Sequence, residues 1–206
     1  MLKLYYAPGA CSLAVHIALE WIGEPYEAVR VKIGSPDYLK INPAGAVPAL
    51  DTGDGWTLTQ AAAILRYLAR RFPKAELGGG DGLREQAEVD RWSSFFTGDL
   101  HPAFFPVFMT QRYTTAKDEA SLAAVRAAAL ALVHTRFGLL ETHLAAREFL
   151  VGDKRSILDA YAFPMVRWGS STLPGGLSDF PNIHAHHERT AADSVVQSVL
   201  ASEARI

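Results

Sequence analysis

The stretch Tyr5-Tyr6-Ala7-Pro8-Gly9-Ala10-Cys11-Ser12 joins a short apolar strand to an amphipathic helix. We expect the strand over residues 2–6, a turn at Pro8-Gly9 and the helix from Ser12 to Ile22. Cys11, the single cysteine of the chain, therefore lies where the helix begins. A helix start offers unpaired backbone N–H groups and a partial positive charge, so a thiol there is expected to ionise more readily than a free one.

Cys11 has two interpretations. A lone cysteine is often a small buried hydrophobic residue, and that interpretation requires no chemistry. Against it, the preceding strand should place Cys11 at the carboxyl edge of a sheet, where open α/β sheets bind ligands. A dithiol redox motif is excluded because the third residue after Cys11 is Ala14. A role as a single thiol remains open.

The residues after the first helix predict a small mixed sheet. Residues 26–32 alternate as a second strand, so the first strand–helix–strand unit should be a right-handed crossover with parallel strands. Residues 47–50 and 56–59 flank Thr52-Gly53-Asp54-Gly55 and predict a hairpin. An apolar stripe at helical spacing follows over residues 61–72 and ends before a proline.

The glycine-rich stretch Leu77-Gly78-Gly79-Gly80-Asp81-Gly82 indicates a linker, after which every segment has helical periodicity. A helix from about Leu83 should be kinked at Gly98 and Pro102. Further helices are expected over about 118–147 and 156–172, and from near residues 181 and 193. The sequence therefore predicts two domains, an α/β domain over residues 1–76 and an all-α domain over residues 83–206.

Composition excludes several classes of protein. Of the 206 residues, 49% are hydrophobic and 20% are charged, which is typical of a globular chain and not of a disordered one. A formal net charge of -2 argues against nucleic acid and anionic membranes as partners. No apolar run approaches the roughly 20 residues of a membrane span, and the N-terminus lacks the pattern of a signal peptide. We expect a cytoplasmic protein.

Several further residues have structural explanations. The bond between Val47 and Pro48 is trans by default, although a cis bond would turn the Val47 backbone toward the first helix. Ser156 and Asp159 have the spacing of a capping box. We expect the histidines at 184, 186 and 187 to form a solvated helix face without a metal, and those at 16, 134 and 143 to have no function. We expect Tyr6 to pack under the first helix. Ser12 is either a helix N-cap or a second reactive hydroxyl.

Five segments together resemble the bacterial beta-class glutathione transferases, in order and over essentially the whole chain. They are the opening Lys3–Leu13 with His16-Ile17-Ala18-Leu19, the cis-proline segment Asn42–Leu50, the γ-glutamyl segment Thr59–Leu68, the stretch Asp99-Leu100-His101 that bears the class histidine, and the folding motif Ser156–Tyr161. The resemblance implies a thioredoxin-like N-terminal domain followed by an all-helical domain. It also implies a homodimer with an active cleft between the domains.

The same resemblance implies a glutathione transferase that conjugates glutathione, its co-substrate, to small electrophiles. Ala10 and Cys11 would bind glutathione at the first helix start, with Cys11 facing the sulfur and able to form a mixed disulfide in thiol exchange. Val47, ahead of a cis Pro48, would bind the cysteinyl backbone, and His101 would reach the cleft from the helical domain. The electrophile would lie near Phe104, Phe105 and Phe108.

The chain departs from the family at the γ-glutamyl site. The family usually has an acidic residue followed by serine where this chain has Gln60 and Ala61. Both would still line the glutathione site, but one lost charge-assisted contact costs about 1.5–3 kcal/mol. This leaves two rivals to the enzyme: a family member that binds apolar ligands with little or no turnover, and a ligand-free assembly module.

Overall fold

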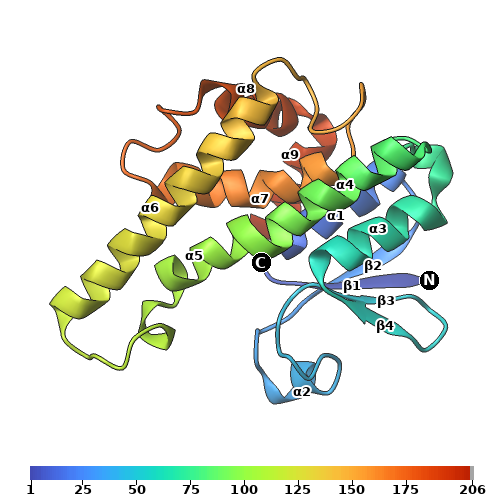
Figure 1. Ribbon diagram of the computed structural model, residues 1–206. Helices are drawn as coiled ribbons and strands as arrows, with labels where there is room; N and C mark the ends of the chain where they lie inside the picture. Colours follow the sequence, from blue (N-terminus) through green and yellow to red (C-terminus); the bar gives the residue numbers. More distant parts are fainter. Residues whose placement is uncertain (205–206) are drawn as a thin grey trace.

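The computed structural model describes residues 1–204 and contains a four-stranded mixed sheet beside a group of helices (Figure 1). The central strand β1 (Leu2–Tyr6) pairs in parallel with β2 (Tyr26–Arg30) and antiparallel with β3 (Ala49–Asp51). β4 (Thr57–Thr59) returns antiparallel to β3, which gives the order β2-β1-β3-β4. The predicted parallel crossover and the predicted hairpin are both confirmed.

Helices α1 (Ser12–Ile22) and α3 (Ala61–Arg71) cover one face of this sheet, whereas the short α2 (Pro36–Leu39) lies away from them (Figure 1). α1 ends at Gly23, whose φ of 75° lies in the left-handed region that glycine adopts without a steric penalty. A short 3-10 turn, η1 (Pro73–Ala75), follows α3. The first strand and the first helix therefore have the predicted bounds.

The rest of the described chain is helical, as predicted. The predicted kink is a π-helical turn that joins two helices, and such turns are frequent at functional sites. The elements are α4 (Leu83–Phe95), the π-helical η2 (Phe96–Leu100), α5 (His101–Phe108), η3 (Thr110–Arg112), α6 (Glu119–Leu144), α7 (Ile157–Thr172), α8 (Pro181–Ala192) and α9 (Ser194–Ala204).

Helix α7 lies at the centre of the molecule and joins its two halves. It contacts α1 and α3 of the sheet half as well as α4 and α8 of the helical half. Its start is held by the predicted capping box, in which Ser156 and Asp159 bond reciprocally. One continuous hydrophobic cluster includes Leu4 and Ile17 from the sheet half and Phe163 from α7. The sheet half is therefore packed directly on the helical half.

Helix α6 is, among the described helices, long and apolar enough by length and composition to cross a membrane. From the sequence we expected no apolar run as long as a membrane span. Phe137 and Leu140 of α6 are buried in the hydrophobic cluster, and α6 packs against α5 and α8. Core helices, which are mostly buried, meet the same criterion of length and composition, whereas 17% of the apolar window of α6 is buried.

Candidate functional site

Cys11 and Val47, predicted separately, face each other in the structure. Cys11 occupies the N-cap position of α1, and its Sγ donates a hydrogen bond to the backbone oxygen of Val47 at 3.2 Å. The peptide bond between Val47 and Pro48 is cis. The first helix start and the proline segment therefore form the two sides of one site.

The expectation that Cys11 ionises readily is wrong for this structure. Burial leaves 9% of Cys11 exposed and raises the pKa of its thiol to about 11. The backbone N–H groups of Cys11 and Ser12 lower this pKa, as the helix start predicts, but by less than burial raises it. At pH 7, well below this pKa, the thiol is almost entirely protonated. Cys11 is therefore a neutral hydrogen-bond donor.

The turn before Cys11 is held in place by the helical half. The indole Nε1 of Trp168, on α7, donates to the carbonyl oxygen of Gly9 at 2.9 Å. The N–H of Gly9 donates to Oε2 of Glu203, on α9, at 3.3 Å, and Oε1 of the same carboxylate accepts from Nδ1 of the buried His16 at 3.0 Å. Sequence reasoning missed Trp168 and Glu203, because nothing in the local pattern signals a contact across more than 150 residues.

Of two residues near strand β1, Ser12 departs from its predicted role and Tyr6 has the predicted one. Ser12 caps no helix, because its Oγ bonds to both the N–H and the carbonyl oxygen of Ala7 at 3.2 Å. It therefore closes the turn that carries Cys11, which corrects the N-cap interpretation. Tyr6 is buried and contacts the ring of His16 on α1, as expected.

The opposite side of the site is held by two residues to which the sequence analysis gave no role. The hydroxyl of Tyr38 and Nδ2 of Asn42 both donate to the carbonyl oxygen of Ala46 at 2.7 Å. Oδ1 of Asn42 also accepts from the N–H of Ala44 at 3.1 Å, which is an Asx turn. The backbone just before Val47 is therefore fixed. The Asn-Pro-Ala-Gly turn signal was the one local hint of this.

His101 begins α5 and joins an aromatic cluster that reaches the Cys11 turn. Its ring lies 4.9 Å from that of Phe105 and 5.2 Å from that of Trp168, measured between centroids. Burial lowers the pKa of His101 to about 4, so its imidazole is neutral at pH 7. Trp168 links His101 to the backbone of Gly9.

The aromatic residues of α5 divide into a buried part and an exposed part. Phe104 is fully buried, whereas 49% of Phe108 is exposed. Their rings are stacked at 5.9 Å, and Trp168 meets both edge-on at 5.4 and 5.5 Å. Together these rings form an apolar wall that continues from the Cys11 turn toward solvent. Phe104 supports this wall from within the core.

Gln60 and Ala61 lie at the start of α3. Gln60 is exposed and has φ 72° and ψ 115°, a backbone conformation that is sparsely populated for a residue other than glycine. Such residues are concentrated at ligand-binding sites. Ala61 is the first residue of the 11-residue helix, whose unpaired N–H groups favour a carboxylate. The helix start is therefore suited to an anionic group, but Ala61 supplies no hydroxyl.

The histidine cluster on α8 corrects the expectation of a solvated face. His186 is buried, and its Nε2 lies 2.7 Å from Oδ1 of Asp159. His187 stacks on Phe163 at 4.7 Å, and burial lowers its pKa to about 4. His184 alone of the three is exposed. Within residues 1–204, no group of three or more histidine, cysteine, aspartate or glutamate side chains has the geometry to hold a metal ion.

Comparison with known proteins places this geometry among characterised relatives. The family model described as glutathione S-transferase, N-terminal domain, matches residues 9–71, and the model for the C-terminal domain of the same family matches residues 99–193. Glutathione S-transferase GST-4.5 of Xanthomonas campestris pv. campestris is 41% identical over 205 residues, which cover 98% of each chain.

Two solved structures have the same fold over nearly the whole chain. The bacterial beta-class glutathione S-transferase of Sphingomonas chungbukensis superimposes with a TM-score of 0.86 at 34% identity, covering 99% of this chain and all of the other. A sphingomonad glutathione S-transferase, solved in complex with glutathione, also gives a TM-score of 0.86, at 32% identity and the same coverage. Both structures support the thioredoxin-like half and the helical half as one continuous architecture.

Proposed function

This chain belongs to the glutathione S-transferase family, and from that premise we propose that it conjugates glutathione to small, apolar electrophiles at the site between Cys11 and Val47. One observation carries the assignment of the site: Sγ of Cys11 lies 3.2 Å from the backbone oxygen of Val47, beside a cis bond to Pro48. This pairing brings a helix start opposite the backbone that leads into β3. An extended peptide such as glutathione can hydrogen-bond to such a segment.

The proposed reaction needs a glutathione thiolate, and the start of α1 supports its formation. The backbone N–H groups of Cys11 and Ser12 lower the pKa of the Cys11 thiol, so this helix start favours a negatively charged sulfur. The proposed role of Cys11 and Ala10 is to hold the sulfur of glutathione beside these groups. The thiolate then attacks the electrophilic carbon, a C–S bond forms, the leaving group departs with its electron pair, and the thiol proton passes to solvent.

The aromatic wall supports an apolar electrophile. Phe108 is the exposed end of the wall, and Trp168 connects it to the Cys11 turn. A chloronitrobenzene suits this wall because its aromatic ring can stack on the exposed side chain of Phe108. We further propose that the chain forms a homodimer with a second copy of itself. Its proposed location is the cytoplasm.

Conjugation of 1-chloro-2,4-dinitrobenzene with glutathione tests the proposal. We expect an enzyme-dependent rise in product absorbance that requires both substrates, together with glutathione binding in calorimetry. Glutathione binding without conjugation of this substrate would support the binding-protein rival instead. If neither binding nor conjugation is detected, the transferase assignment of this site is wrong.

Thiol exchange through Cys11 is not favoured by the geometry. The attacking species in exchange is the thiolate, and the pKa of about 11 leaves very little of it at neutral pH. The contact with Val47 also directs the thiol proton toward a carbonyl oxygen and not toward a general base. We therefore propose that Cys11 mainly positions the ligand.

His101 is expected to act as a neutral hydrogen-bonding group and not as a titrating base. Because its folded-state pKa of about 4 lies below the usual 6.5, the ring stays neutral from pH 5.5 to 8.5. Log kcat/KM should therefore show no inflection from His101 in this range. His101→Phe, which keeps an aromatic ring, should lower kcat about tenfold by removing one hydrogen bond of about 1.4 kcal/mol.

The control for His101 is His101→Gln, which keeps both a donor and an acceptor and should retain most of the activity. An inflection near pH 6.5 that disappears in His101→Phe would contradict the neutral role. Charging His101 opposes folding, because the folded-state pKa is lower than the unfolded one. Stability should therefore fall as the pH drops from about 6.5 toward 4, and this loss should be smaller in His101→Phe.

A further inference from the structure

Gly169 lies within α7 and directly follows Trp168, whose indole belongs to the aromatic wall of the transfer site. Glycine is less favourable than alanine inside a helix, and an isolated glycine there usually has a packing or functional reason. Gly169 is buried and continues the helix on both sides, so its backbone conformation does not require glycine. The reason must therefore lie in what occupies the space beside it.

The ring of Phe137, on α6, fills the space where a side chain at Gly169 would begin. A Cβ added to Gly169 would lie 2.4 Å from both Cε2 and Cζ of Phe137. The most favourable separation of two non-bonded carbon atoms is about 3.5–4.0 Å, so these atoms would overlap. The missing side chain therefore lets the Phe137 ring lie directly against the backbone of α7.

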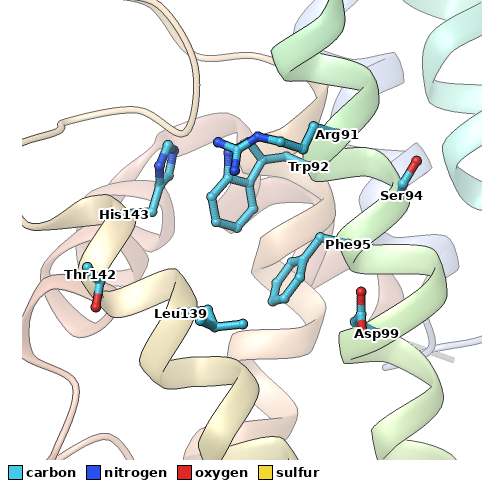
Figure 2. A pocket seen from close by; sticks show the side chains of 8 residues that line it. All are labelled: Arg91, Trp92, Ser94, Phe95, Asp99, Leu139, Thr142 and His143. Atoms are coloured by element: carbon cyan, nitrogen blue, oxygen red, sulfur yellow. The ribbon is translucent and has the colours of Figure 1, made fainter.

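The Phe137 ring is enclosed by other buried rings. It lies 6.2 Å from the ring of Phe104, on α5, and 5.4 Å from that of Phe180, which precedes α8, measured between centroids. All three side chains are buried. The cavity between α4 and α6 offers no room for it, because Leu139 of α6 lines that cavity and Phe137 does not (Figure 2). A closely packed interior transmits such a displacement and does not absorb it.

Phe104 connects Phe137 to the aromatic wall. Its ring stacks on that of Phe108 at 5.9 Å and meets that of Trp168 at 5.4 Å. Helix α7 is held by its contacts with α1, α3, α4 and α8, so an added Cβ would displace the Phe137 ring more easily than the helix. The displaced ring would press Phe104 toward Phe108 and Trp168. The space beside the wall would then be narrower.

We propose that Gly169 is a positioning residue that sets the width of the electrophile site, and that the absence of a side chain there admits bicyclic aromatic electrophiles. In this role Gly169 contacts neither substrate and acts on the wall through Phe137 and Phe104. The role rests on the proposed transferase function and adds to it the size of the electrophile. Because the affected space is on the electrophile side, KM for glutathione should not change when residue 169 becomes alanine.

Gly169→Ala tests this proposal with two electrophiles that share a reacting group, benzyl chloride and 1-(chloromethyl)naphthalene. In both, the glutathione thiolate displaces chloride from a benzylic carbon, and the second compound has one more fused ring. We expect kcat/KM to fall about tenfold or more for the naphthyl compound and to stay nearly the same for the benzyl compound. Liquid chromatography of the thioether products, at saturating glutathione, measures both values.

The matched control is Gly138→Ala, on α6, where an added Cβ would extend into open space. It introduces the same methyl group into a helix beside Phe137 and should leave the naphthyl-to-benzyl ratio unchanged. Phe137→Leu supplies the rescue, because leucine lacks the two ring atoms that the new Cβ would meet. In the double variant Gly169→Ala/Phe137→Leu, the ratio should return toward the wild-type value. The double variant also serves if Gly169→Ala alone does not fold.

Urea denaturation of the single and double variants measures the contact without any substrate. We expect the effects of Gly169→Ala and Phe137→Leu on stability to be non-additive, because the two residues touch. Additive effects, or an unchanged ratio in an active Gly169→Ala variant, would overturn the role of Gly169 and leave the transferase function standing. If the wild-type protein conjugates neither compound nor 1-chloro-2,4-dinitrobenzene, the transferase function is wrong and this role falls with it.

Discussion

Replacing Asp159 by alanine is expected to lower the free energy of unfolding by about 3–5 kcal/mol, because four hydrogen bonds converge on this buried carboxylate. Oδ1 accepts from the N–H of Leu150 at 3.0 Å and lies 2.7 Å from Nε2 of His186. Oδ2 accepts from the N–H and the hydroxyl of Ser156 at 2.7 and 2.9 Å. Alanine would leave these donors buried without an acceptor.

Urea denaturation measures this loss, and thermal melting should show a fall of roughly 6–20 °C for a chain of this size. Asp159→Asn is the matched control, since it keeps one carbonyl oxygen and the shape of the side chain, and it should cost less. Ser156→Ala removes one hydroxyl and should cost about 1 kcal/mol. An Asp159→Ala loss no larger than that of Ser156→Ala would show that the carboxylate acts only as a local cap.

Asp159 also shows which part of a site can be predicted from sequence. Its bond to Ser156 was predictable, because a capping box is a pattern of residues three positions apart. Its contact with His186 could not be predicted, because the two residues are 27 positions apart on two helices. The pattern of neither helix shows how the two pack against each other. The expectation of a solvated histidine face failed for that reason. His186 is polar, but its partner is a buried acid and not water.

The Cys11 site divides in the same way. The bounds of β1 and α1, and hence the position of Cys11 at a helix start, follow from local periodicity and a Pro-Gly turn. The ionisation of Cys11 depends instead on burial in the folded chain. The helix start lowers the pKa of the thiol, but desolvation on burial raises this pKa by more. Local sequence therefore predicted where the thiol lies, but not its charge.

The contacts of Glu203 with the Cys11 turn and with α1 are the hardest to predict from sequence, because they join the two ends of the chain. Glu203 is 194 residues from Gly9 and 187 from His16, yet one buried carboxylate bonds to both. An isolated glutamate in a C-terminal helix is usually a solvated residue, so no pattern in the sequence distinguished it. The two halves of the chain thus determine the shape of the site jointly.

Changing Ala61 to serine is expected to strengthen glutathione binding by roughly tenfold to a hundredfold. Ala61 is the first residue of α3, so a serine there would place a hydroxyl beside the unpaired N–H groups of the helix start. A charge-assisted hydrogen bond to a carboxylate contributes about 1.5–3 kcal/mol, which corresponds to that change in affinity. Because the contact lies at the end of the ligand away from the sulfur, kcat should stay the same while KM for glutathione falls.

Isothermal calorimetry with glutathione and KM measured at saturating electrophile check this prediction, with Ala63→Ser as the matched control. Ala63 is exposed on the same helix, so its serine variant should leave both values unchanged. Gln60→Glu should add only a few-fold gain, since Gln60 is exposed and a surface charge is screened by solvent. Equal affinity in Ala61→Ser and Ala63→Ser would mean that the γ-glutamyl end is not held at the start of α3. The site would then bind glutathione mainly through Val47 and the first helix. Weak glutathione binding would then not be caused by the missing hydroxyl at position 61.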